Sequence, residues 1–203
     1  MILFELLGSE AHPIYQKLQV ENLDRQYSFL RSIVEAALAS SMPMLSIEVI
    51  KALNYHAISC LHVSPGEFRP CPVTVGSYRP PEHFQVPALM QMFTNQVNRF
   101  WENSDPVTLA TYILWRLNHI HPFVNGNGRT ARVAAYYILC IKAGGWLSGT
   151  KLLPERLVER RSDYVNALQF ADNSLQDGPV QLEPLHALVS ELLDAQIREA
   201  GVT

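Results

Sequence analysis

The 203-residue chain has few cysteines, few lysines and no long apolar run. Its three cysteines (Cys60, Cys71 and Cys140) are odd in number and widely spaced, which argues against both a disulfide framework and a zinc site. No run of lysine and arginine marks a nucleic-acid footprint, and the formal net charge is -3. The longest apolar run, residues 133–141, is far too short to cross a bilayer. We therefore expect a cytoplasmic protein that binds neither nucleic acid nor a membrane.

The composition is that of a folded domain, since 48% of the residues are apolar and only 17% are charged. A chain of this length buries about 70% of its unfolded surface. Apolar residues recur at helical spacing on both sides of an irregular stretch at residues 65–81. We expect one mostly α domain over residues 1–203, with N-terminal helices in 1–43, a core in 44–172 and a C-terminal helix in 173–203. The expected helices cover about 10–20, 23–38, 46–61, 86–101, 106–120, 128–143, 154–171 (in two pieces) and 182–200.

The most informative stretch is the polar segment at residues 121–132, His-Pro-Phe-Val-Asn-Gly-Asn-Gly-Arg-Thr-Ala-Arg, set between two apolar helical patterns. Glycine takes positive φ at little cost, and backbone N–H groups at a helix start bind anions. Arg129 and Arg132 are three residues apart, so on a helix they share a face and can direct two guanidinium groups at one phosphate chain. The residues expected to form the anion nest are Gly126, Asn127 and Gly128.

His121 lies one loop before this nest and is a candidate base. The hydroxyl of serine, threonine or tyrosine is a poor nucleophile at neutral pH, and histidine, with a reference pKa of about 6.5, is suited to activate it. His119 lies two residues earlier, so on a helix it points to a different face and forms a poor metal chelate with His121. We expect His119 to bond a free carbonyl in the last helical turn.

This segment resembles the signature of the Fic family, HPFx(D/E)GNGRxxR, at eight of the nine specified positions. The resemblance implies a Fic-like helical domain that transfers AMP from ATP to a Ser, Thr or Tyr hydroxyl of a target protein, with pyrophosphate leaving. It implies that His121 is the base and that Phe123 anchors the loop in the core. It also implies that Asn127 and nearby amides hold phosphate oxygens, that Arg129 binds along the phosphate chain and that Arg132 neutralises the terminal phosphates.

The position that departs from the signature is Asn125, where the family usually has Asp or Glu. In members that transfer AMP, this acid holds Mg²⁺. An amide oxygen can ligate a hard cation, but it lacks the charge that makes a carboxylate a good Mg²⁺ ligand. We therefore expect Asn125 to contribute a weakened Mg²⁺ site.

Two further segments resemble parts of the family's active site. In the first, Val73-Thr-Val75 followed by Gly76-Ser77 predicts a short strand and turn, hence a β-hairpin. It resembles the Fic flap, whose edge clamps an extended target segment by main-chain pairing; a plain surface hairpin is the alternative. In the second, residues 164–172 resemble the segment that lines the adenine pocket, although Tyr164 and Asp172 are equally compatible with ordinary helix positions. The expected flap residues are Val73, Thr74, Val75 and Gly76.

Many Fic proteins carry an inhibitory helix with the motif Ser/Thr-x-x-x-Glu-Gly/Asn. Here Ser32-Ile-Val-Glu35 is one residue too short, and Glu199 is flanked by alanine. Inhibition in cis is therefore not expected, and a separate antitoxin-like partner stays open. The arginines at 156, 160 and 161 form a local patch that we interpret as a solvated helix face. Two functions remain: transfer of AMP or another phosphate-containing group, or a module that binds nucleotide or a partner without efficient transfer because of Asn125.

Overall fold

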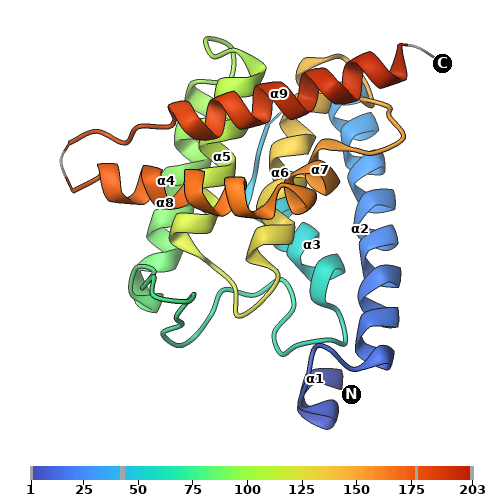
Figure 1. Ribbon diagram of the computed structural model, residues 1–203, viewed down its shortest axis with the longest axis vertical. Coiled ribbons are helices and arrows are strands. Elements are labelled where there is room, and N and C mark those ends of the chain that lie inside the picture. The colour runs from blue at the N-terminus through green and yellow to red at the C-terminus, as the bar shows by residue number, and fades with distance from the viewer. Residues whose placement is uncertain (1, 42–43, 177, 202–203) are drawn as a thin grey trace.

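The computed structural model describes residues 2–41, 44–176 and 178–201, which form nine α-helices and one short 3₁₀ helix (Figure 1). The predicted boundary between residues 43 and 44 is only partly described, because Met42 and Pro43 lie outside these ranges, as does Asp177. The elements are α1 (Leu3–Leu7), α2 (Pro13–Ser40), α3 (Ile47–Ile58), η1 (His83–Gln85), α4 (Val86–Arg99), α5 (Pro106–Ile120), α6 (Asn127–Lys142), α7 (Leu153–Glu159), α8 (Arg161–Ser174) and α9 (Glu183–Ala200).

Helix α6 forms the centre of the domain, as its apolar sequence predicts. Almost every residue from Thr130 to Ile141 is buried, because α5, α2, α3 and α7 pack around it. Helices α8 and α9 lie across the others (Figure 1). The loop that joins α5 to α6 lies at the same end of the molecule as the long loop that follows α3. Burial of α6 therefore fixes its N-terminus, where the polar motif lies.

Helix α2 corrects the prediction of two N-terminal helices, since residues 13–40 form one helix of 28 residues. Two polar side chains interrupt its apolar pattern. Asn22 and Gln26 are fully buried and donate to the carbonyls of Ser59 and Leu53, both at 2.8 Å. These bonds, together with the one that Arg25 donates to Oδ1 of Asn22, hold both amides in the core, while the buried Oε1 of Gln26 has no hydrogen-bond partner among the described residues. The interruption is therefore one of polarity and not of backbone conformation, which apolar spacing alone does not reveal.

The flap has the predicted turn but a single β-bridge in place of a strand. Val75 and Tyr78 exchange two backbone hydrogen bonds of 3.0 Å around Gly76 and Ser77. Gly76 has a φ of 59°, which favours glycine in a tight turn. The ladder does not extend, because residues 80 and 81 are prolines without N–H donors and a lone hairpin is marginal in water.

Helix α1 attaches to the end of α3 through a small second core. Leu3, Tyr15 and Leu61 are buried together. The N–H groups of Leu3 and Phe4 donate to the carbonyls of Cys60 and Leu61 at 2.9 and 3.0 Å. None of the helices described is long and apolar enough to cross a membrane.

Candidate active site

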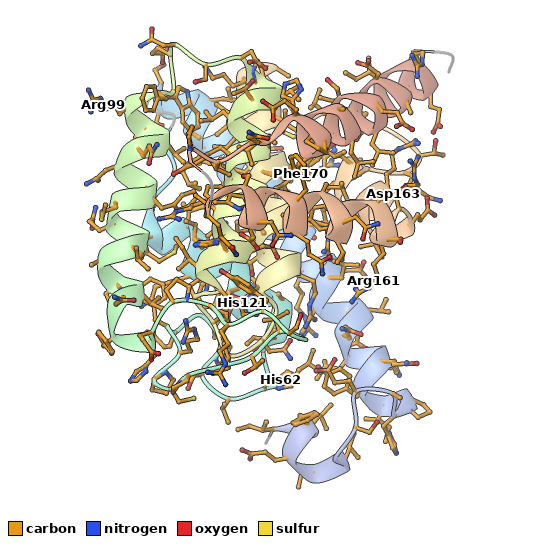
Figure 2. The ribbon with its side chains drawn as sticks, turned by 60° about the vertical axis from the view of Figure 1, so that its left-hand side comes forward. His62, Arg99, His121, Arg161, Asp163 and Phe170 are labelled. Atoms are coloured by element: carbon orange, nitrogen blue, oxygen red, sulfur yellow. The ribbon has the colours of Figure 1, made fainter. Side chains whose placement is uncertain are left out.

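His121 lies at the junction of α5 and the loop leading to α6, beneath α8 (Figure 2). Its backbone is left-handed, with a φ of 51°, and its N–H donates to the carbonyl of Leu117 at 3.0 Å. A left-handed residue ends the helix and redirects the chain. The imidazole Nδ1 lies 3.4 Å from the carbonyl oxygen of Asn118. Because a carbonyl only accepts, Nδ1 carries the hydrogen and the neutral ring keeps a free lone pair on Nε2.

Burial sets the protonation state of this histidine. It lowers the pKa of His121 from 6.5 to about 4, while the hydrogen bond to Asn118 opposes the shift and the charge of Arg69 adds to it. The imidazole is therefore neutral at pH 7, in the form that accepts a proton from a hydroxyl.

Arg69 fastens both ends of the flap to the motif. Its side chain is buried, and its guanidinium donates to the carbonyls of His121 at 2.8 Å and Cys71 at 3.1 Å, and to that of Pro81. Its own N–H donates to the carbonyl of Pro122 at 2.9 Å. One planar donor group thus joins three chain segments. Sequence reasoning assigned no role to Arg69, whose only signal is its place beside a proline at the start of the flap.

Asn127 braces the motif loop from inside. The N–H of Phe123 donates to Asn127 Oδ1 at 2.9 Å, and Asn127 Nδ2 donates to the carbonyl of Phe123 at 2.8 Å. Both residues are buried, which agrees with the predicted role of Phe123 as the loop's anchor. Because the Asn127 amide is occupied within the loop, only its backbone N–H is left for an anion.

Gly126 lets α6 begin in close contact with α3. Its φ is 76°, and a Cβ atom there would lie 2.6 Å from Cγ2 of Ile58. The first N–H group with an acceptor inside the helix is that of Thr130, which donates to the carbonyl of Gly126 at 2.9 Å. The N–H groups of the preceding turn have no partner within a helix and carry its positive dipole end. The predicted nest therefore lies where the helix geometry favours an anion.

A pocket of about 590 Å³ opens beside this helix start and is bounded by the flap turn, α5, α6, α7 and α8. This volume lies in the range of small-molecule and cofactor sites. Residues of the predicted site that line it are His121, Gly128, Arg132, Tyr164, Asp172, Val75 and Gly76. Predicted residues outside the lining are Asn125, Gly126, Asn127, Arg129, Val73 and Thr74. Ser77 and Tyr78 of the predicted flap and Val165, Leu168 and Gln169 of the predicted adenine-pocket segment also line it. Lining residues that sequence reasoning did not place there are Asn118, Leu157, Val158 and Arg161.

The charges of the pocket are separated along α8. Arg161 stands at the start of this helix and acts electrostatically on Arg132, whereas Asp172 lies eleven residues further on, about 16 Å along the axis. Figure 2 shows Arg161 and Asp163 near the same end of α8. One end of the pocket is therefore cationic and the other carries a carboxylate. Sequence reasoning interpreted this arginine patch as a solvated face, and Arg160 and Arg161 are both exposed. Arg160 is paired with Asp163 and with Glu191 on α9, whereas Arg161 also lines the pocket.

Arg132 is the inner cation of the pocket. Burial lowers its pKa, and the hydroxyl groups of Tyr164 and Tyr27 lie near enough to oppose this shift. A guanidinium stays charged in a protein. Across residues 2–41, 44–176 and 178–201, Arg132 has no hydrogen-bonded or ion-paired partner. A partly buried charge without a partner is costly, so an anion in the pocket would compensate it.

Arg129 points away from this pocket, toward the end of α3. Its Nη1 donates to the carbonyl of Ala57 at 3.0 Å, and its Nη2 donates to Oδ1 of Asn125 at 2.9 Å. Nδ2 of Asn125 in turn donates to Oε1 of Glu10 at 3.0 Å. Glu10 also contacts His62, which stacks on Phe4 of α1.

The residues around Asn125 do not fit a Mg²⁺ ion. Its amide oxygen accepts from a guanidinium, which would repel a cation, and its side chain is absent from the pocket lining. Among the described residues, no three His, Cys, Asp or Glu side chains gather as a metal site. The nearest carboxylate, that of Glu10, is engaged by Asn125 and His62. These contacts give Asn125 a role in holding the loop.

The structure corrects the expectation for His119. Its ring does not bond a free helix carbonyl; Nδ1 lies 2.8 Å from Oδ1 of Asp172 and 2.9 Å from the hydroxyl of Tyr78. Trp115 Nε1 donates to the same Asp172 oxygen at 2.9 Å. The missed signal was the spacing of Trp115 and His119, which places both rings on one helix face.

Neither glutamate considered for inhibition approaches Arg132. Glu35 is exposed on α2. Glu199 accepts a hydrogen bond from Arg156, which lowers the pKa of the Glu199 carboxyl. Both therefore have the surface roles that their flanking sequences predict.

The fold and the site define a helical domain built around a glycine-containing loop that carries a neutral histidine at the start of a buried helix. Residues 44–139 match the model of the Fic/DOC family, and over this core the chain belongs to that family. Relatives named protein adenylyltransferase Fic are 36% identical over 138 residues in Drosophila persimilis and in Drosophila grimshawi. These alignments cover 66% of this chain but only 26% and 27% of the two relatives.

Solved structures show the same fold. A Fic-1 fragment from C. elegans superposes with a TM-score of 0.76 at 23% identity, covering 98% of this chain and 56% of that one. BepC from Bartonella tribocorum, solved with bound AMPPNP, gives a TM-score of 0.53 at 14% identity, with 83% and 86% covered. At these identities the likeness concerns the fold.

Proposed function

We propose that this domain transfers AMP from ATP to a Ser, Thr or Tyr hydroxyl of a target protein. The observation that carries the proposal is the juxtaposition, in one pocket, of a neutral His121 with the start of α6 and the unpartnered cation of Arg132. A phosphate chain would satisfy the cation and the helix N–H groups together. The relatives' name, protein adenylyltransferase Fic, supports the same reaction.

In this reaction the target hydroxyl oxygen attacks the α-phosphorus of ATP. Its proton passes to Nε2 of His121, a new P–O bond forms, and the bond from the α-phosphorus to the bridging oxygen breaks so that pyrophosphate leaves. Arg132 and the amides of the α6 N-terminus stabilise the charge on the phosphate oxygens. The bound phosphates also raise the pKa of His121 toward neutrality, which strengthens it as a base.

The separated charges of the pocket orient the nucleotide. Its phosphates face Arg132 and Arg161, past Tyr164, and its base extends along α8 toward Asp172. Extended ATP is comparable in length to the 16 Å or so between the charged ends. Arg129 reaches the phosphates only if it leaves Ala57 and Asn125.

Three further predictions concern Mg²⁺ binding, the docking of the target segment and a separate inhibitor. The weakened Mg²⁺ site at Asn125 would require that residue to release Arg129, so we propose that the chain itself contributes little to metal binding. The target segment would pair with the flap turn at Val75 and Gly76, which borders the pocket. A separate antitoxin-like inhibitor would find its ionic partner in Arg132.

A second candidate function is nucleotide binding without efficient transfer. The bonds that withdraw Asn125 and Arg129 from the pocket favour it. The two candidates differ in what they require of His121, because a binding module needs no base there.

The test is transfer of label from α-labelled ATP to protein in a cell lysate, comparing the native chain with His121→Ala. The expected result is labelled protein with the native chain, at least a hundredfold less with the variant, and equal ATP affinity by calorimetry. Equal labelling by both proteins would refute the role of His121. Tight ATP binding without label from the native chain would instead establish the binding module.

A further inference from the structure

The tip of the flap is fastened to the body of the domain through one side chain. Within residues 72–80, all of which are described, the hydrogen bonds that leave the flap come from the hydroxyl of Tyr78. The other backbone bonds of this segment join Val75 and Tyr78 to each other. Arg69 holds the two ends of the flap at Cys71 and Pro81. The position of the tip over the pocket therefore depends on what Tyr78 binds.

Tyr78 binds His119, and His119 binds the pocket carboxylate. The Tyr78 hydroxyl lies 2.8 Å from the backbone oxygen of His119 and 2.9 Å from its Nδ1. The same Nδ1 lies 2.8 Å from Oδ1 of Asp172. The rings of Tyr78 and Trp115 lie beside the imidazole, with centroids 5.8 and 5.3 Å from it.

The chemistry of the groups assigns the hydrogens. The Asp172 carboxylate and the His119 carbonyl only accept. Nδ1 of His119 must therefore carry a hydrogen, which it shares between the carboxylate and the phenolic oxygen. The phenolic O–H is then free to donate to the carbonyl, so one arrangement satisfies all of the groups.

We propose that His119 is a positioning residue that latches the flap to the end of the pocket at Asp172. The latch consists of Tyr78, His119 and Asp172, and it joins the surface that would receive the target to the helix that would receive the nucleotide base. This assignment rests on the proposed function for the identity of the two ligands. Loss of the latch releases the flap while the cationic end of the pocket, with His121 and Arg132, stays in place.

The test follows hydrogen exchange of residues 71–81 by mass spectrometry in the free protein and with a non-hydrolysable ATP analogue. Tyr78→Phe keeps the ring and removes the hydroxyl. It should speed exchange of the flap about fivefold to tenfold, because one hydrogen bond is lost. Tyr112→Phe is the matched control, since its hydroxyl donates to Gln96 at 2.9 Å outside the pocket lining. Unchanged flap exchange in Tyr78→Phe would overturn the latch.

A pair of His119 variants separates positioning from a general structural role. His119→Asn retains an amide near the place of Nδ1 and should keep most of the flap protection, whereas His119→Leu should lose it. In transfer assays with α-labelled ATP and cell-lysate protein as the acceptor, His119→Leu should raise the apparent KM for the lysate protein about tenfold and leave the apparent kcat within threefold. A fall in kcat with unchanged KM, or equal behaviour of Asn and Leu, would contradict the proposal.

The two proposals fail in distinguishable ways. If calorimetry shows that the analogue binds neither the native protein nor the variants, the proposed function fails. Hydrogen exchange in the free proteins then still decides whether Tyr78 holds the flap. If the analogue binds and the flap exchanges alike in native protein and Tyr78→Phe, the latch fails and the proposed function stands.

Discussion

At the scale of single residues, the ability of each polar side chain to bind a ligand depends on whether it is already hydrogen-bonded within the protein. His121 and Arg132 reach the pocket with free functional groups, whereas Asn125, Asn127 and Arg129 are bonded to other parts of the chain. The difference decides the chemistry, because a side chain that is already hydrogen-bonded must break those bonds before it can bind a ligand.

The pKa of His121 provides a direct test of the site. In the free protein, the imidazole should titrate near 4 because burial disfavours its charged form. Addition of ATP should raise this pKa by at least one unit, since phosphates nearby favour the imidazolium. Two-dimensional NMR of the histidine side chains measures both values. A pKa near 6.5 in the free protein, unchanged by ATP, would contradict the described burial and the adjacent anion site.

Asn125→Asp tests the role of Asn125, the position at which the motif differs from the Fic signature. The change places a carboxylate beside that of Glu10 and removes the hydrogen bond between them. The single variant should be destabilised by about 1 kcal/mol. Paired with Glu10→Gln, which removes the repulsion, it should increase Mg²⁺-dependent transfer more than the single change does.

Rates measured against Mg²⁺ concentration check this expectation, with Glu10→Gln alone as the control. If Asn125→Asp, alone and combined with Glu10→Gln, transfers at the native rate or below, the absence of an acid at position 125 does not limit the reaction.

At the scale of elements, the close contact of α6 with α3 fixes the N-terminal end of α6, where we expect an anion to bind. Gly126 permits this contact, since its φ is 76° and Ile58 leaves no room for a Cβ atom. Gly126→Ala should destabilise the fold by about 2–4 kcal/mol, from left-handed strain and overpacking together. Denaturant unfolding measures it. Gly145→Ala is the matched control, because no atom lies within 4 Å of its added carbon, and it should change stability by less than about 0.5 kcal/mol. Equal effects of the two changes would argue against the contact.

At the scale of the whole molecule, the buried histidines make stability depend on pH. Burial lowers the pKa of His121, His56 and His62, so the unfolded chain takes up protons at these sites before the folded chain does. Stability from this source is full above pH 6.5 and is lost as the pH falls toward 4.

The urea concentration at the unfolding midpoint should therefore decrease as the pH is lowered from 7 to 4.5. The decrease should be smaller in His121→Gln, which lacks the titrating ring. A native midpoint that is constant over this range, or a variant with the same slope, would contradict the linkage. Circular dichroism at 222 nm follows both transitions.

The sequence by itself determined the helical fold, the break between α7 and α8, the start of α6 and the residues of the motif. These features are local: apolar spacing, capping residues and glycines act within a few positions of one another. Through the resemblance to the Fic family it also predicted that His121, Gly128, Arg132, Tyr164 and Asp172 belong to one site, and in the structure these residues line one pocket.

Only the tertiary structure decided how the polar side chains pair. Glu10 meets Asn125 across 115 positions, Arg129 meets Ala57 across 72, and His119 meets Asp172 across 53. Such pairings depend on how the helices pack, because each side chain binds whichever partner the fold brings within reach. The same reason explains why apolar spacing did not predict one long α2. The buried amides of Asn22 and Gln26 donate to the carbonyls of Ser59, which follows α3, and of Leu53 within α3, and no local spacing reveals these bonds.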